Sequence, residues 1–252
     1  MQLIVVWQDV SSRRWYPVAR VGQEHGEYWF RYTRAAAELN ARFGYINNMT
    51  DLDREYRSFE LFSFLQNRLF NKSRADLPRY LERIGLERDS ANDPLQELAA
   101  SGGPRATDPF QLILVPENTD GRYRLPFFVH GMRHTAESQL ERAAELSAGE
   151  RLFIQRDVQN RDDIRAYSLR TAEPQALVGY LPRIISDDLE QLLNANGFGK
   201  VTVSVLSNFR DAPPRMRLRC SLESPWPAGF KPFATEPFQA LATTRPPARV
   251  VA

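Results

Sequence analysis

Apolar and polar residues alternate strictly near the end of the chain, and this pattern constrains the fold more than any other feature. Over residues 201–205, three valines stand between polar residues. Over residues 215–222, apolar residues alternate with a row of arginines, Arg215, Arg217 and Arg219. Since successive side chains of a strand point to opposite faces, each segment predicts a strand with one face in the core and the other in solvent.

The first part of the chain predicts an antiparallel meander followed by helices. Strand-like segments at 3–7, 15–21 and 27–33 are separated by polar turns. From Ser58 the apolar spacing becomes helical, and further helical segments follow at 77–86 and 94–101. The sequence Ser-Gly-Gly-Pro at 101–104 stops this region, so we expect a first domain at residues 1–105.

The second part predicts strands and helices in a different order. Segments 110–115 and 122–131 form an expected hairpin through Asp120-Gly121. We expect a helix at 136–146 capped by Thr135, then strands at 151–156, 164–170 and 176–181, then a helix that Ser186 caps and Asn196-Gly197 ends. With the two strands described first, this order over residues 106–223 fits a small closed barrel with helical insertions.

Prolines accumulate from Ser224 onward, so we expect residues 224–252 to form an extended tail. The whole chain is therefore predicted to be α+β. It would consist of an antiparallel β meander with helices, a small β-barrel with two helices, and the proline-rich tail.

Composition limits the class of protein more than its function. Hydrophobic residues make up 42% and charged residues 25% of the chain, as in ordinary globular proteins. The apolar run at 3–7 is too short for a membrane span and lacks the flanks of a secretory signal, so we expect a cytoplasmic location. The net charge is only +2, with the more basic half at the end, so attraction to DNA through charge alone should be limited.

Three segments of the second part resemble HIRAN domains. They are FFVHGMRH at 127–134, GERLFIQRDVQNRDDIRAYSL at 149–169 and VGYLPRIISDDLEQLL at 178–193. Their order and spacing are similar to those of the family, and the resemblance covers residues 125–222. It implies an OB-like or SH3-like β-barrel that binds DNA, at the 3′ end of a single strand.

The resemblance also implies a site, because these three segments converge on one pocket in the family. Arg133 would contact phosphate, Asp163 would accept a hydrogen bond from the terminal sugar hydroxyl, Asn160 would shape the loop, and Tyr180 would line the pocket with its ring. The chemistry suits these roles, since arginine binds phosphate and aromatic faces stack on bases without reading sequence. A carboxylate repels phosphate, which selects a free 3′ hydroxyl over a continuing backbone.

Some of these positions have a second interpretation. His134 and Asp162 stand where aromatic residues are common in the family, and Asp162 places a negative charge beside an anion site. Asn160 and Asp163 are also typical of a tight turn with no binding role. The arginine row that includes Arg215 and Arg217 is either a track for the DNA backbone or a solvated strand face, and we favour the solvated face.

Catalytic and metal sites are not indicated. His130 and His134 have the spacing of a zinc-binding helix, but Gly131 replaces the glutamate of a metalloprotease motif. The chain has no P-loop motif and no acid two residues before any lysine, which argues against an ATPase and a restriction-type nuclease. We expect no enzyme activity and no cofactor.

The first 105 residues resemble the small N-terminal subdomain of HipA-type toxin kinases. The segments that carry this resemblance are the LIVVW start, EYWFRYT, and the run FSFLQNRLFNKSRADLPRYLERIGL. The resemblance implies protein contacts without kinase activity. Two functions therefore compete. One is a non-catalytic adaptor that binds single-stranded DNA ends, with a helicase or kinase as an expected protein partner. The other is a protein-interaction component of a toxin–antitoxin or defence system that contacts a kinase or antitoxin.

Overall fold

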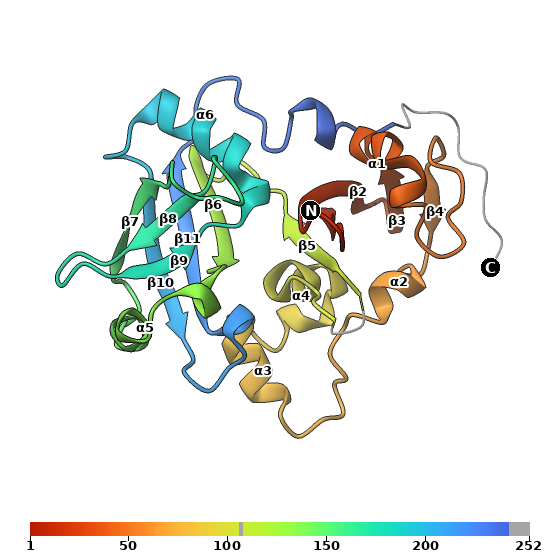
Figure 1. The fold of residues 1–252 in the computed structure, drawn as a ribbon. Helices are drawn as coiled ribbons and strands as arrows, with labels where there is room; N and C mark the ends of the chain where they lie inside the picture. Colours follow the sequence, from red (N-terminus) through yellow and green to blue (C-terminus); the bar gives the residue numbers. More distant parts are fainter. Residues whose placement is uncertain (106–107, 242–252) are drawn as a thin grey trace. The chain divides into compact units, whose positions relative to one another are not determined.

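A computed structural model describes residues 1–105 and 108–241. The chain divides into two compact units. The first comprises residues 1–82, 86–115 and the part from Phe233 onward, and the second comprises residues 83–85 and 116–232. This division differs from the predicted 1–105, 106–223 and 224–252. Each unit has its own antiparallel sheet, so the chain is mixed α+β (Figure 1).

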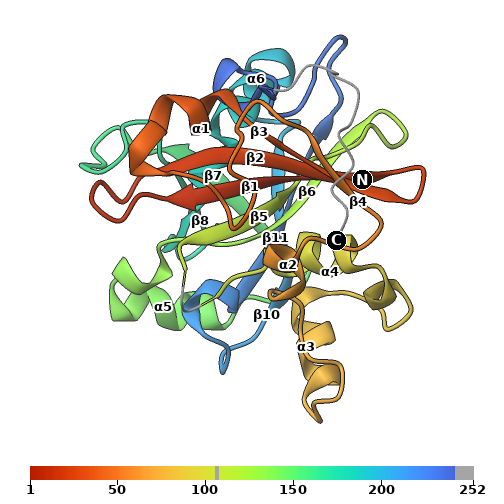
Figure 2. The ribbon, with the colours of Figure 1, turned by 90° about the vertical axis from the view of Figure 1, so that its right-hand side faces the viewer.

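The first unit contains a five-stranded sheet in the order β4-β3-β2-β1-β5. Figure 2 shows β1, β2 and β5 side by side. The predicted meander is confirmed, because β1 pairs with β2 and β2 pairs with β3, all antiparallel. The strands are β1 Gln2–Gln8, β2 Trp15–Glu24, β3 Glu27–Tyr32, β4 Tyr56–Ser58 and β5 Phe110–Leu114.

The hairpin expected between 110–115 and 122–131 is wrong. Strand β5 pairs with β1, from Leu3 opposite Leu114 to Trp7 opposite Phe110. The predicted turn does form, since Asp120 and Gly121 both take positive φ and Thr119 bridges Arg122. Its two flanks nevertheless belong to different sheets. A turn signal reports local geometry only, whereas apolar strands pair with whichever partner completes a core.

Helices of the first unit follow the predicted apolar spacing in part. The segment from Ser58 gives only the short helix α2, and the predicted segments at 77–86 and 94–101 give α3 and α4. Asp93 caps α4 by accepting a hydrogen bond from the Leu95 amide at 2.9 Å, and Gly102 ends it in the left-handed conformation. The helices are α1 Arg34–Leu39, η1 Asn40–Arg42, α2 Ser63–Gln66, α3 Leu77–Ile84, η2 Ser90–Asn92 and α4 Pro94–Ser101.

The second unit contains a six-stranded sheet in the order β6-β11-β10-β7-β8-β9. All of its neighbouring strands are antiparallel, and the alternation predicted over 201–205 is confirmed, since Val203 and Val205 are buried. The strands are β6 Arg122–Phe128, β7 Arg151–Arg156, β8 Tyr167–Arg170, β9 Leu177–Tyr180, β10 Thr202–Asn208 and β11 Leu218–Pro225.

The two edges of this sheet meet at one point, so the sheet is curled. His130, just after β6, forms an isolated bridge with Tyr180 at the end of β9. Each backbone amide donates to the other residue's carbonyl at 2.9 Å. Gly179 permits this approach, because a Cβ there would lie 2.5 Å from the His130 carbonyl oxygen.

Two helices of the second unit, α5 Glu137–Ala144 and α6 Ser186–Asn196, lie toward opposite ends of its sheet (Figure 1). Both predicted caps are wrong. Ala136 and Ile185 occupy the N-cap positions, and neither helix has a side-chain cap. Thr135 is buried instead, with its hydroxyl unpartnered among the described residues. The predicted end of α6 at Asn196-Gly197 is confirmed.

The predicted strand over 215–222 begins too early. Pro213 and Pro214 lead into a short 3-10 helix, η5 Pro214–Met216, because proline fixes φ and lacks the amide that a strand ladder needs. Arg215 therefore lies on η5 and Arg217 follows it, and Arg219 alone of the three belongs to β11. The prediction of a continuous arginine row on one strand is therefore wrong.

The segment from Ser224 is packed where the structure describes it. Strand β11 runs to Pro225, and Trp226 and Phe230 pack against Tyr123 in the second unit. A 3-10 helix, η6 Glu236–Phe238, follows in the first unit. The extended tail is therefore wrong for residues 224–241, and residues 242–252 lie outside the described part. Within the described ranges, no helix has both the length and the apolar character needed to cross a bilayer.

Candidate nucleic-acid interface

The loop between β7 and β8 is shaped by Asn160. Its side-chain oxygen accepts hydrogen bonds from the amides of Asp162 at 3.0 Å and Asp163 at 2.9 Å. Asp163 continues the turn by accepting from the Arg165 amide at 3.0 Å. The loop-shaping role expected for Asn160 is therefore present, and so is the tight-turn geometry of the alternative interpretation.

Tyr180 is the point where the three predicted segments come together. Its hydroxyl donates to Asp157 Oδ2 at 2.9 Å, which ties β9 to the start of the loop. Its ring lies so close to Gly131 that a Cβ there would be 2.9 Å from Tyr180 Cδ2. Burial and the neighbouring Asp157 carboxylate raise the pKa of the Tyr180 phenol. The ring is therefore held in one place as a neutral hydrogen-bond donor.

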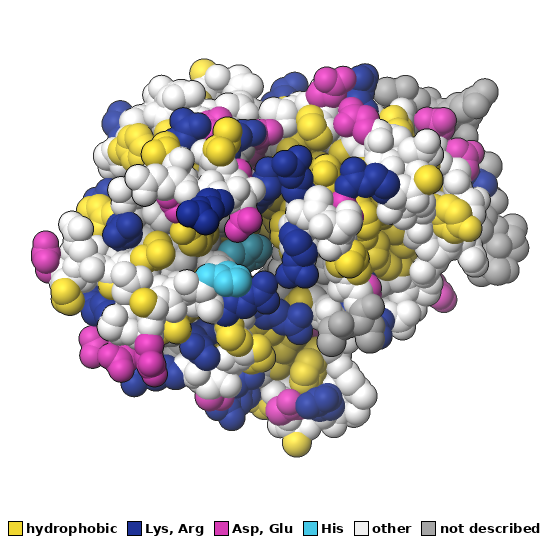
Figure 3. Space-filling view, in the orientation of Figure 1, with side chains coloured by type: hydrophobic (Ala, Val, Ile, Leu, Met, Phe, Trp, Pro, Cys, Tyr) yellow, Lys and Arg dark blue, Asp and Glu magenta, His cyan; other side chains and the backbone are white. Residues whose placement is uncertain are grey.

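Arg133 and His134 are exposed on a 3-10 helix, η3 Met132–His134, that packs against β9. Arg133 Nε donates to His134 Nε2 at 3.0 Å. Figure 3 shows histidine side chains at the surface of the second unit with basic side chains beside them. Helix η5, which carries Arg215, lies against η3. Arg215 therefore stands near the predicted site although the arginine row is not formed.

Asp163 is less available than the sequence suggested. Only 13% of its side chain is exposed, and its Oδ2 pairs with Arg183 Nε at 3.1 Å. Asp162 next to it is exposed. Arg183 was not among the predicted site residues, although it lies in the VGYLPRIISDDLEQLL segment. Its distance in sequence from the loop hid the pairing, which the fold creates by bringing the end of β9 beside the loop.

Arg217 was predicted as a site residue and His130 stands one residue before the GMRH segment, but both have buried polar groups. Burial lowers the pKa of His130 to about 4, so its ring is neutral at pH 7. Arg217 Nε is buried with no hydrogen-bond partner among the described residues. In residues 1–105 and 108–241, no three His, Cys, Asp or Glu side chains gather in a group that could hold a metal ion.

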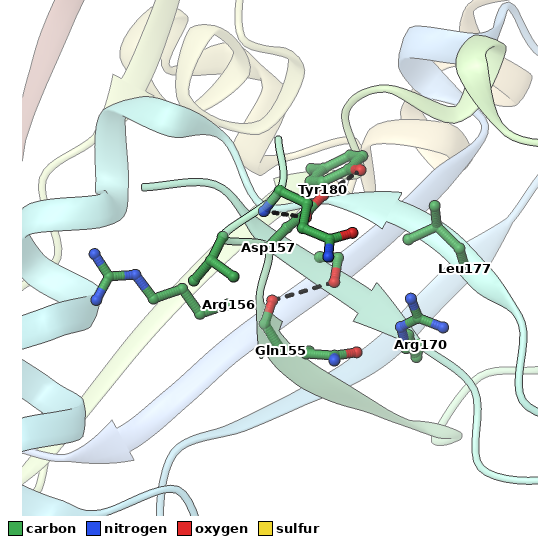
Figure 4. Close-up of a pocket in the computed structure, with 9 residues that line it drawn as sticks. Gln155, Arg156, Asp157, Arg170, Leu177 and Tyr180 are labelled. Carbon is green, nitrogen blue, oxygen red and sulfur yellow. Dashed lines mark hydrogen bonds between the residues drawn. The ribbon is translucent and has the colours of Figure 1, made fainter. Parts of the chain in front are cut away.

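A pocket of about 300 Å³ opens on the outer face of β7, β8 and β9. Figure 4 shows Tyr180 and Asp157 at one side and Arg170 with Leu177 at the other, while Arg156 extends away. Tyr180 is the one predicted site residue in the lining of this pocket. Strand alternation could have found Gln155, Ser168 and Arg170, which share one face of β7 and β8. The other lining residues are Arg156, Asp157, Val158, Gln159 and Leu177.

Comparisons with known proteins place a family within the second unit. Residues 123–226 match the model of the HIRAN domain family. A crystal structure of a protein from Lactobacillus plantarum is 19% identical, covers 41% of this chain and 99% of its own, and has a TM-score of 0.32. A crystal structure of the HIRAN domain of human HLTF is 18% identical, covers 42% of this chain and 82% of its own, and has a TM-score of 0.30.

No curated protein matches the chain. The resemblance of residues 1–105 to HipA-type kinases is not tested by these comparisons and stays a prediction. The family match includes the GMRH segment, the Asn160 loop and Tyr180, which the structure brings together. The chain therefore carries a HIRAN domain at residues 123–226.

Proposed function

We propose that this protein binds the 3′ end of single-stranded DNA through its HIRAN domain and acts there without catalysis. The HIRAN domain is a known DNA-binding domain, and the match covers residues 123–226. The observation that carries the proposal is the convergence of η3, the Asn160 loop and the end of β9 around Tyr180.

The phosphate of the terminal nucleotide is bound by cations on two sides of this convergence. Arg133 is exposed on η3, and Arg183 is 38% exposed beside the loop. Arginine presents a planar fork of donors that matches phosphate oxygens. His134 lies beside Arg133 and offers a ring for stacking in place of the aromatic residue common in the family.

Selection for a free end rests on Asp163. Its carboxylate accepts a hydrogen bond from the Arg165 amide and forms an ion pair with Arg183, which leaves lone pairs for a sugar hydroxyl. A phosphate at the 3′ position would instead meet the charges of Asp163 and the exposed Asp162. The same two carboxylates lower the affinity for DNA as a whole, so we expect weak but end-specific binding.

The test is fluorescence anisotropy with 5′-labelled single strands of one sequence, ending in a 3′ hydroxyl or a 3′ phosphate, and a blunt duplex. We expect the 3′-hydroxyl strand to bind most tightly, and Arg133→Ala to weaken it by about tenfold or more, as expected for loss of a charge-assisted phosphate contact. Arg124→Gln is the matched control, because Arg124 is exposed on β6 and pairs with Glu223. Equal binding of all three ligands would overturn the proposal.

A further inference from the structure

The pocket on the outer face of β7, β8 and β9 lies over two rows of side chains that cross the three strands, and every member of these rows lines it except Phe153. In one row, Gln155 is opposite Ser168, and Ser168 is opposite Tyr180. In the other row, Phe153 is opposite Arg170, and Arg170 is opposite Leu177. Residues two apart on β7 and on β8 share a face about 6.5 Å from each other, so the rows lie side by side there. On β9, Leu177 and Tyr180 are three apart, and a register shift in the pairing of β8 with β9 leaves both of them lining the pocket.

Arg170 supplies the cation of this face. Its Nε is buried and has no hydrogen-bond partner among the described residues. The side chain nevertheless lines the pocket, so a phosphate group there would lie beside a guanidinium, which forms strong charge-assisted hydrogen bonds with phosphate oxygens. Arg170 also acts electrostatically on Tyr180, lowering the pKa of its phenol against the larger effects that raise it. A polar, open pocket with a cation at its wall is suited to a phosphate group.

Phe153 supplies an aromatic surface next to that cation. Its side chain is 47% exposed although it is large and apolar. The Arg151 guanidinium lies over its ring, 5.5 Å from the centroid, which holds the ring in place. Exposed aromatic rings beside arginines are the usual components of surfaces that bind single strands without sequence preference.

Asp157 does not prevent a phosphate from binding at Arg170. Its Oδ2 accepts from the Tyr180 hydroxyl at 2.9 Å, and its Oδ1 accepts from the Gln159 amide at 3.3 Å. Both oxygens are therefore engaged within the loop. In Figure 4, Asp157 stands with Tyr180, across the pocket from Arg170 and Leu177.

Tyr180 belongs both to this pocket, which it lines, and to the end site, by which we mean the proposed 3′-end site formed by η3, the Asn160 loop and the end of β9. In the end site its ring packs against Gly131. We propose that the pocket is a second nucleotide subsite, in which Arg170 binds a phosphodiester upstream of the 3′ end and Phe153 stacks on its base. This inference rests on the proposed function. It predicts that the affinity depends on strand length, because only a longer strand reaches from the end site past Tyr180 to Arg170.

The test compares a 3′-hydroxyl dinucleotide with a decamer that has the same 3′ end, on the full chain. Arg170→Met keeps the aliphatic stem and Phe153→Ala removes an exposed ring. Each should weaken decamer binding by about tenfold, the scale of one stacked base, and leave dinucleotide binding unchanged. Arg170→Met should also lower the slope of log affinity against log salt by about 0.7, the value for one phosphate contact on a single strand.

Controls separate this inference from the proposed function. Phe198→Ala removes another exposed ring of the second unit, on the turn after α6, and should change neither ligand. The subsite would be overturned if Arg170→Met and Phe153→Ala both kept the wild-type dependence of affinity on strand length and the wild-type slope of log affinity against log salt. If Arg170→Met fails to fold, Phe153→Ala decides alone. Loss of end preference in the unmodified protein would instead overturn the proposed function.

Discussion

Replacing Gly179 by alanine should open the sheet of the second unit where its edges meet. The new Cβ would lie 2.5 Å from the His130 carbonyl oxygen and 2.6 Å from Val129 Cγ1, both closer than real Cβ atoms approach. Gly179 also has a φ of 152°, which L residues rarely adopt. Relief of the contact requires His130 and Tyr180 to separate.

The cost follows from what that separation breaks. The two reciprocal backbone hydrogen bonds between His130 and Tyr180 are each 2.9 Å long. At about 1 kcal/mol for each bond, plus about 1–2 kcal/mol for overpacking, the second unit should lose roughly 3 kcal/mol of unfolding free energy. For a unit of this size that corresponds to a fall in Tm of about 10 °C.

Two assays check this prediction. Thermal unfolding by circular dichroism measures the fall in Tm, and hydrogen exchange measures the protection of the His130 and Tyr180 amides, which should be lost first. Gly199→Ala is the matched control, since nothing lies within 4 Å of a Cβ there. An unchanged Tm and protected amides in Gly179→Ala would contradict the inference that Gly179 is needed for the bridge between His130 and Tyr180. DNA affinity should fall together with the hydrogen-exchange protection of these amides, because the bridge between His130 and Tyr180 holds η3 beside Tyr180.

Three further changes test other parts of the structure. Asn160→Ala removes the acceptor of two loop amides, so it should lower the free energy of unfolding by about 1–2 kcal/mol and weaken DNA binding. Asn160→Asp keeps an acceptor oxygen and should retain both the stability and the DNA binding. Equal behaviour of the two variants in unfolding and in anisotropy would contradict this prediction. The pKa of His130 in the folded protein is about 4, below its ordinary value of 6.5. Its contribution to stability is therefore lost as pH falls from 6.5 toward 4. His130→Gln should flatten the pH dependence of the unfolding free energy between pH 6.5 and pH 4. Asp108→Ala leaves the buried Arg68 guanidinium without its carboxylate and should destabilise the first unit by about 3 kcal/mol, which Arg68→Met in the same chain should partly restore.

The sequence predicted those parts of the fold that depend on local pattern. Strand-like segments were recognised in the sequence for every strand except β4, and helices were expected where α3, α4, α5 and α6 form. It did not predict which strands pair. Strand β5 has the pattern of a hairpin partner for β6, yet it pairs with β1, at a distance of about a hundred residues in sequence. Such long-range pairing depends on how whole faces are buried, which no short window contains.

The site could be predicted as far as a family resemblance and turn chemistry allow. Asn160 and Tyr180 lie in the segments that the motifs indicated. Glycine is needed at 131 and 179 because Tyr180 and the His130 carbonyl come too close to these positions for a Cβ. Arg183 was missed because its partner Asp163 lies in a loop far away in sequence, and Arg170 was missed because the pocket that it lines is formed by three strands together. The arginine row failed for a local reason, since Pro213 and Pro214 start η5 where a strand was expected.

The central claim is that the 3′ end of a single strand lies at the convergence around Tyr180. Photo-crosslinking tests it most directly, with a photoreactive thymidine analogue placed either at the 3′ or at the 5′ terminus of one decamer and adducts located by mass spectrometry. We expect the 3′ probe to react with peptides spanning 131–134, 157–165 or 180–183, and we expect no such reaction from the 5′ probe. Adducts of the 3′ probe elsewhere, or equal labelling of these peptides by both probes, would contradict it.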